Sequence, residues 1–203
     1  MALVEGRSRT RLLAGTCAAA LMPLAVTFIL QSRPTAQTPP PFTASANPVT
    51  DFVRTLVARE SKNIVGSAEL MPAEKYGYQP TPAQMTFGQL IAHIVQTNVA
   101  LCSAIGGTPA PMTPEDLKKL AGTDPKEALI AAVKKSFDYC VESLAKVQDT
   151  SLGEEVSMFG RRTGQSRAAT LITIANDWAD HYSTAASYLR LNGILPPTAQ
   201  PKK

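Results

Sequence analysis

Large apolar residues recur every three or four positions in four stretches of the chain, the spacing of amphipathic helices. In the first stretch, Asn47 can cap a helix whose first turn holds Pro48, and the apolar positions continue to about Ala68. The apolar stripe of this predicted helix includes Phe52, Leu56 and Ile64.

The second stretch begins at Thr86, with Gln89 three residues later, an arrangement typical of a capping box at a helix start. The pair Gly106-Gly107 ends this predicted helix. Its apolar side consists of Phe87, Leu90, Ile94, Leu101 and Ile105.

The third and fourth stretches follow the same helical spacing. The third opens with Asp124-Pro125, and its apolar positions are Ile130, Val133, Phe137, Cys140, Leu144 and Val147. The fourth stops before Gly193, and its apolar positions are Leu171, Ile174, Ala175, Trp178, Tyr182, Ala185 and Leu189.

The connections between these helices are rich in turn-forming residues. Prolines indicate a loop over 72–82, Thr113 and Gly122 bound a short connecting helix, and three glycines indicate a loop over 151–165. The alternating pattern of a β-strand does not occur. Four long amphipathic helices without a sheet predict an all-α fold, a four-helix bundle over 48–197, followed by a disordered tail at 198–203.

The N-terminal region differs in composition from the rest. Three arginines, Arg7, Arg9 and Arg11, precede an apolar run from Leu12 to Leu30, which is typical of a secretory leader. We interpret residues 1–36 as a signal peptide or, since the run is long enough to span a bilayer, as a membrane anchor. Residues 37–47 are expected to be a flexible linker. The expected location is periplasmic or secreted, and membrane-anchored without cleavage.

The charge of the chain argues against one class of partner. The net charge of +4 belongs largely to residues 1–36, and without them it falls to about +1. A nearly neutral domain lacks the basic surface that nucleic acid binding requires, so we expect no nucleic acid partner. Membrane contact is expected only through the N-terminal segment.

The chain has only two histidines. His93 lies beside Leu90 and Ile94 on the apolar side of its helix, and alone it is most simply a hydrogen-bonded core residue. Asp177 and His181 are four residues apart on one helix face, so both side chains can reach one metal ion. The alternative is a simple carboxylate–imidazolium pair. Thr97 and Asn98, one turn beyond His93, are candidates for contacts around such a site.

Several motifs together resemble the DinB-like (DinB/YfiT) superfamily of metal-dependent enzymes, over a match from Asn47 to Pro197. They are Met71-Pro72-Ala73-Glu74-Lys75-Tyr76 with Tyr78 and Pro80, Phe87-Gly88-Gln89-Leu90-Ile91-Ala92-His93, and His181-Tyr182 leading to Tyr188-Leu189-Arg190, Gly193 and Pro196-Pro197.

The resemblance implies a divalent metal held by one histidine of the second helix and a His-x-x-x-His pair of the fourth. His93 and His181 match two of these positions, and Asp177 replaces the remaining histidine. Two histidines and one carboxylate suit Zn, Ni, Fe(II) or Mn. The resemblance implies hydrolase or thiol-dependent transferase chemistry on a small-molecule substrate. The alternative is an exported, non-catalytic binding module whose metal site is structural or degenerate.

The resemblance also implies an up-down-down-up order of the helices, in which the second and third run parallel. Cys102 and Cys140 then lie at similar heights, so we expect a disulfide between them. Two separate buried thiols are the alternative. A homodimer is a further expectation, because bundles of this size can dimerise.

Overall fold

The computed structural model describes residues 43–201. Four long helices form the bundle: α1 (Pro48–Leu70), α2 (Phe87–Gly106), α4 (Lys126–Ala145) and α5 (Arg167–Leu191). The shorter elements are α3 (Pro114–Lys119), the strands β1 (Glu155–Met158) and β2 (Arg161–Ser166), and the 3-10 turns η1 (Ala73–Lys75), η2 (Asp149–Ser151) and η3 (Pro197–Ala199). The predicted leader and most of the predicted linker lie outside the described residues.

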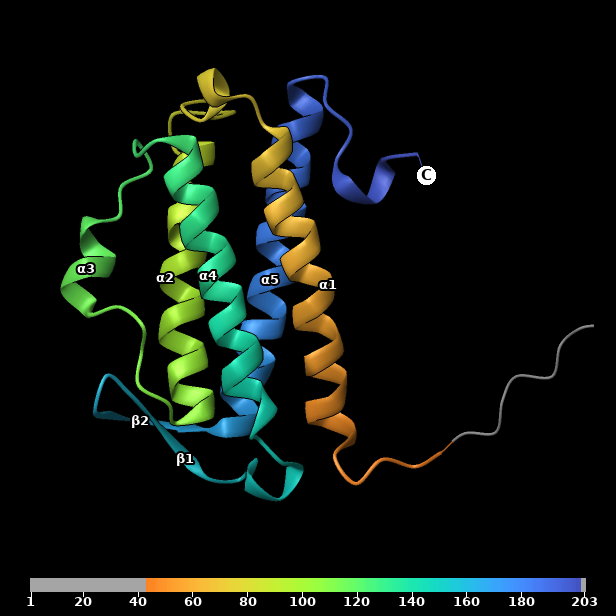
Figure 1. The fold of residues 1–203 in the computed structure, drawn as a ribbon, viewed down its shortest axis with the longest axis vertical. Helices are drawn as coiled ribbons and strands as arrows, with labels where there is room; N and C mark the ends of the chain where they lie inside the picture. Colours follow the sequence, from red (N-terminus) through yellow and green to blue (C-terminus); the bar gives the residue numbers. More distant parts are fainter. Residues whose placement is uncertain (1–42, 202–203) are drawn as a thin grey trace, which may run out of the picture. The chain divides into compact units, whose positions relative to one another are not determined.

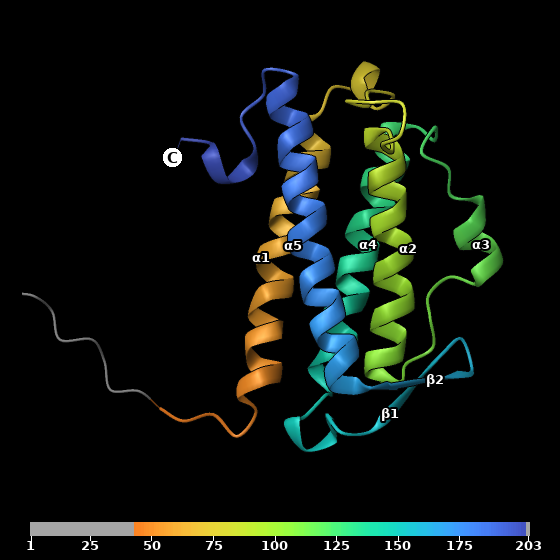
Figure 2. The same cartoon turned by 180° about the vertical axis from the view of Figure 1, so that it is seen from behind.

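The chain runs up along α1, down along both α2 and α4, and up again along α5 (Figures 1 and 2). The expected all-α, up-down-down-up bundle is therefore confirmed. Because α2 and α4 are parallel, the segment between them, residues 107–125, must return along the length of the bundle. We call this segment the crossover; it contains α3.

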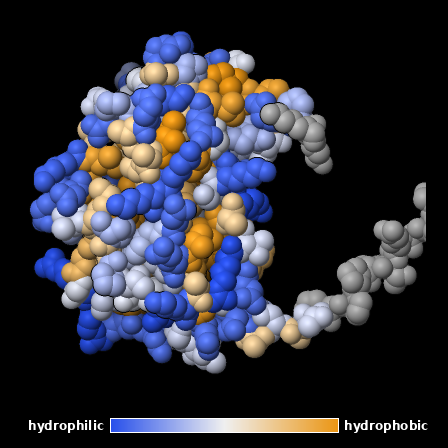
Figure 3. All heavy atoms as spheres, in the orientation of Figure 1, coloured by the Kyte–Doolittle hydropathy of each residue, from blue (hydrophilic) through white to orange (hydrophobic). Residues whose placement is uncertain are grey.

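The core lies between the four helices and is filled by large apolar side chains without exposed surface. Its largest members are Trp178, Phe87, Phe137, Ile64, Met71, Ile91, Ile94 and Ile105. Polar and charged residues cover most of the face seen in Figure 3, and apolar residues show in a broken seam down the middle, at the top of the view and toward its left edge. Helix α2 is apolar and long enough to cross a membrane, but 67% of that stretch is buried in the bundle, as in a core helix.

Residues far away in the sequence stabilise the helix ends. The carboxylate of Asp149 accepts hydrogen bonds from the backbone N–H groups of Val49 and Thr50, both at 2.9 Å. The side chain of Asn47, expected to cap α1, instead accepts a hydrogen bond from the Asp149 backbone. An ionised acceptor binds the free N–H groups at a helix start more strongly than an amide does, so Asp149 takes this role.

The capping box at α2 is as expected: Thr86 accepts from the Gln89 backbone, and the Gln89 side chain accepts from the Thr86 backbone. Cys102 of α2 and Cys140 of α4 form a disulfide, with their Cα atoms 5.1 Å apart. This bond joins the two parallel helices.

The segment 151–165, expected to be a loop, contains most of an antiparallel hairpin instead. The prediction that the chain has no strands is therefore wrong. Only Val156 of the two strands is buried, so the hairpin lacks the alternating pattern that identifies a strand in a sequence. Phe159 and Gly160 form its turn, both with positive φ.

The first residues of the predicted C-terminal tail belong to a turn, and residues 202–203 lie outside the described residues. Pro197–Ala199 form the 3-10 turn η3, and the hydroxyl oxygens of Thr198 and Tyr182 lie 2.6 Å apart. A hydrogen bond between them holds this turn against α5.

Candidate metal centre

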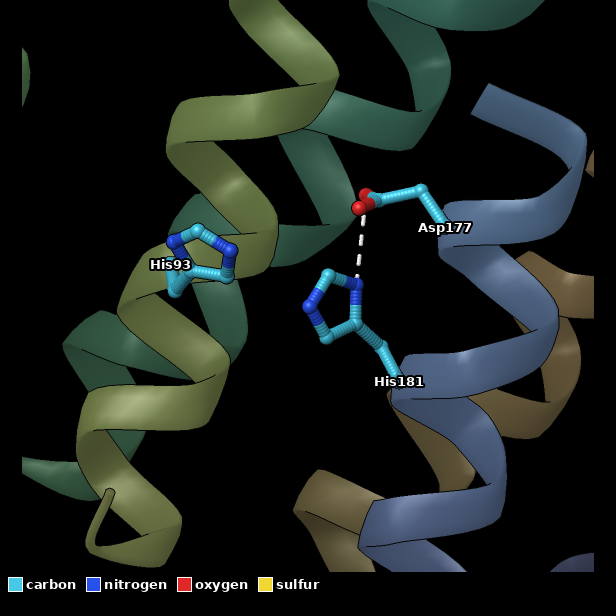
Figure 4. A group of neighbouring side chains, drawn as sticks. All are labelled: His93, Asp177 and His181. Carbon is cyan, nitrogen blue, oxygen red and sulfur yellow. Dashed lines mark ion pairs between the residues drawn. The ribbon is translucent and has the colours of Figure 1, made fainter. Parts of the chain in front are cut away.

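Three side chains from two helices converge on one point (Figure 4). His93 projects from α2, whereas Asp177 and His181 project from successive turns of α5. One possible ligand atom from each residue lies within 4.8 Å of the other two. The structure therefore brings together the three residues that the sequence singled out, as a group that could hold a metal ion.

The atoms facing this point are buried and unsatisfied. His181 is 7% exposed, and its Nδ1 lies 3.2 Å from Oδ2 of Asp177. At this distance the two groups form an ion pair once the imidazole is protonated, and neither atom has any other hydrogen-bond partner among residues 43–201. Buried polar atoms with so few partners are costly, and one cation between them would satisfy both. The residues present thus fit a divalent ion.

The two imidazole rings are close neighbours, with centroids 5.0 Å apart and planes at 73°. Burial, and then repulsion from His181, lowers the pKa of His93. Burial alone would raise the pKa of Asp177, but His181, Thr97 and His93 together hold that pKa below its usual range. A neutral imidazole and an ionised carboxylate are the forms that bind metals.

The residue after Asp177 anchors α5 in the core. Trp178 has no exposed surface and donates a hydrogen bond from Nε1 to Oδ1 of Asn98 on α2, at 2.7 Å. Asn98 therefore lies behind the site, whereas Thr97 lies beside the Asp177 carboxylate. The helical spacing then places Asp177 and His181 toward α2.

His93 also lines a cavity of ≈ 1020 Å³ between the start of α2, the start of α4 and the crossover. Its polar lining includes Gln89 and Gln96, which lie one turn before and one turn after His93. In the sequence, Gln89 is recognisable only as part of the capping box and Gln96 is not singled out, although their spacing from His93 places all three on one helix face. Asp177 and His181 do not line this cavity. His93 is therefore the one residue that belongs both to the cavity lining and to the candidate metal centre.

Comparison with known proteins identifies the family. The family model of the DinB superfamily matches residues 56–185. No curated protein matches the chain closely in sequence.

Solved structures show the same fold. A DinB-like protein from Bacillus cereus is 18% identical with a TM-score of 0.58, over 72% of this chain and 95% of that chain. A DinB-like protein from Bacillus subtilis is 17% identical with a TM-score of 0.54, over 74% of this chain and 99% of that chain.

A mycothiol-dependent maleylpyruvate isomerase is similar over a smaller part, at 19% identity and a TM-score of 0.51, over 66% of this chain and 59% of the isomerase. The family match covers more than half of the sequence and includes His93, Asp177 and His181. The chain therefore belongs to the DinB superfamily.

Proposed function

We propose that this chain is an exported metal-dependent enzyme that holds one divalent ion with His93, Asp177 and His181. The observation that carries the proposal is the buried pair Nδ1 of His181 and Oδ2 of Asp177, which faces the same point as His93 and has no other hydrogen-bond partner among the described residues. Two imidazoles and one carboxylate favour Zn, Ni, Fe(II) or Mn.

Three protein ligands suit catalysis better than a purely structural role, because structural zinc sites normally use four. A bound ion supplies Lewis acidity and makes water or a thiol more acidic. The protein's own residues orient the ion: Asp177 and His181 lie on one rigid helix, and Trp178 fixes that helix against α2. Both histidines are committed to the ion, so no histidine remains as a general base.

Two reaction types follow from this arrangement, hydrolysis and thiol-dependent transfer. Thiol dependence has support from the similar isomerase, which is described as mycothiol-dependent. Hydrolysis has support from the three-ligand set itself, since it is the common set of zinc hydrolases. Export has support from the basic and apolar pattern of residues 1–36.

Metal analysis of the purified chain tests the proposal. We expect one divalent ion per wild-type chain, and loss of most of the ion in His93→Ala and in Asp177→Ala. The matched control is Asp180→Ala, because Asp180 is an exposed carboxylate on the same helix and lies outside the site. A wild type without a stoichiometric ion, or variants with unchanged metal content, would refute the metal site. A retained ion without turnover of esters, amides or thiol conjugates would instead indicate a binding module.

A further inference from the structure

The buried disulfide and the candidate metal centre are connected through one side chain, the amide of Asn98. We infer that the Cys102–Cys140 bond acts through Asn98 to position the metal ligands of α5 against His93, and that it thereby raises the affinity of the centre for its ion. This inference rests on the proposed function, because it assigns positioning residues to the same centre.

The disulfide holds α2 against α4 at the level of Asn98. Cys102 lies four residues after Asn98 on α2, and Sγ of Cys140 lies 3.6 Å from the backbone oxygen of Asn98. Asn98 and both cysteines have no exposed surface. A disulfide keeps its two Cα atoms within about 7 Å of each other, and here they are 5.1 Å apart. The bond therefore fixes the register of the two helices beside the amide.

The amide of Asn98 has one orientation that satisfies its neighbours. The hydroxyl of Ser136 on α4 donates to the backbone carbonyl of Val133, at 2.8 Å, so its oxygen is left to accept from Nδ2 of Asn98, at 3.0 Å. The indole N–H of Trp178 can only donate, and Oδ1 of Asn98 accepts from it at 2.7 Å. The amide is planar, so its two ends move together. A shift of α2 against α4 therefore breaks one of these bonds or moves α5.

The residues beside the bond between Asn98 and Trp178 belong to the metal centre or contact it. Asp177 directly precedes Trp178 on α5, and Thr97, which directly precedes Asn98 on α2, lies beside the Asp177 carboxylate. Two consecutive residues of α2 thus hold two consecutive residues of α5. His93 faces the α5 ligands from the other helix (Figure 4). Loss of the amide link lets α5 turn and moves its ligands away from His93.

A metal centre is sensitive to a movement of this kind. Ligand atoms must lie within about 0.2 Å of their bonding distances, and this centre takes its ligands from two helices. Loss of the residues that orient metal ligands typically lowers metal affinity by about 10–100-fold. The contacts that hold α2, α4 and α5 in register therefore contribute to the affinity for the ion.

The zinc affinity of the purified full chain, measured by competition with a coloured chelator, tests this inference. The variants are Asn98→Leu, the double variant Cys102→Ala with Cys140→Ala, and the combination of all three substitutions. We expect Asn98→Leu and the double variant each to weaken zinc binding about tenfold. The combination is expected to bind zinc as Asn98→Leu does, because the disulfide acts through Asn98.

Two further variants separate positioning from a general loss of stability. Val53→Ala shortens a buried side chain of α1 outside this network, so it destabilises the fold but is expected to keep the zinc affinity of the wild type. Trp178→Phe removes the donor to Asn98 and is expected to weaken zinc binding as Asn98→Leu does. It takes the place of Asn98→Leu if that variant does not fold.

Cobalt in place of zinc gives a second readout, because its visible absorption bands depend on the arrangement of the ligand atoms. We expect Asn98→Leu and the cysteine double variant to shift these bands, and Val53→Ala to keep them. Bands shifted equally in Val53→Ala would contradict a specific positioning role.

The outcomes separate this inference from the proposed function. Wild-type zinc affinity in both Asn98→Leu and the cysteine double variant would overturn this inference and leave the metal centre in place. Losses that multiply to about a hundredfold in the combined variant would show that the disulfide acts independently of Asn98, and would also overturn it. A wild type that takes up neither metal would overturn the proposed function and this inference together.

Discussion

The indole Nε1 of Trp178 lies 2.7 Å from the amide oxygen of Asn98, and this hydrogen bond joins α5 to α2 inside the core. The same amide donates from Nδ2 to the hydroxyl of Ser136 on α4, at 3.0 Å. Asn98 therefore links three helices directly behind the candidate metal centre. Because Trp178 follows Asp177 in the sequence, this link also sets the rotation of the helix that presents Asp177.

Replacing Asn98 with Leu leaves the buried indole N–H of Trp178 without its partner. We expect the free energy of unfolding to fall by about 1–3 kcal/mol, the cost of an unsatisfied buried group. Urea unfolding measures this change. Trp178→Phe is a useful comparison, because it removes the donor but keeps an aromatic ring in the core. If Asn98→Leu lowers the free energy of unfolding no more than an average surface substitution does, the hydrogen bond between Asn98 and Trp178 does not stabilise the core.

Reduction of the disulfide is expected to destabilise the domain. Cys102 and Cys140 are 38 residues apart in sequence. The entropy of closing a loop of that size corresponds to about 4 kcal/mol in the chain-entropy model. Urea unfolding with and without a reducing agent measures the difference, and Cys102→Ser with Cys140→Ser serves as the matched double variant. If the reducing agent destabilises that variant equally, its effect does not come from this bond.

The cap at the start of α1 predicts a dependence of stability on pH. Burial tends to raise the pKa of Asp149, but hydrogen bonds from Val49 and Thr50, with the charge of Arg54, hold it below the usual 3.8. A lowered pKa in the folded state means that the carboxylate stabilises the fold above pH 3.8, and that this contribution is lost as the pH falls through the folded value.

Asp149→Ala is therefore expected to lower the thermal midpoint at neutral pH, with a difference from wild type that narrows as the pH falls below 3.8. Thermal unfolding followed by circular dichroism measures both quantities. Asp138→Ala, an exposed aspartate on α4, is the control and is expected to follow the wild type at every pH. A constant difference between Asp149→Ala and wild type across this range would argue against the charged cap.

Close packing of two glycines holds the crossover against α2. A Cβ atom added at Gly88 would overlap the backbone oxygen of Gly122, and one added at Gly122 would overlap the backbone of Gln89. We expect Gly88→Ala to destabilise the domain by about 1–3 kcal/mol, as overpacking usually does. Gly153, whose added Cβ would meet no atom within 4 Å, provides the control substitution to Ala. Equal urea midpoints for the two variants would show that the crossover shifts to make room for the added Cβ atom at little cost in stability.

The four long helices were predictable because each buries one side. The spacing of apolar residues such as Phe137 and Leu144 therefore indicates a helix with one buried face. The hairpin was not predictable on this basis, because Val156 is its one buried strand residue. The cap of α1 was assigned to the nearest polar residue, Asn47, whereas the group that binds the free N–H groups comes from Asp149. Contacts between residues so far apart in sequence leave no local pattern.

The candidate site was predictable in its ligands but not in its surroundings. Asp177 and His181 could be paired by their spacing on one helix, and the family resemblance added His93. The hydrogen bond between Asn98 and Trp178, and the cavity beside Gln96, depend on how three helices and the crossover pack. These features required the structure.

The route of the chain between its two parallel helices has a consequence for how such a protein can diversify. The candidate metal ligands lie on α2 and α5, whereas Leu120, Ala121, Gly122, Thr123, Asp124 and Pro125 of the crossover supply much of the adjoining cavity wall. Evolution can therefore lengthen, shorten or replace residues 107–125 and change the shape and chemistry of this cavity, while the candidate metal centre on the helices is preserved.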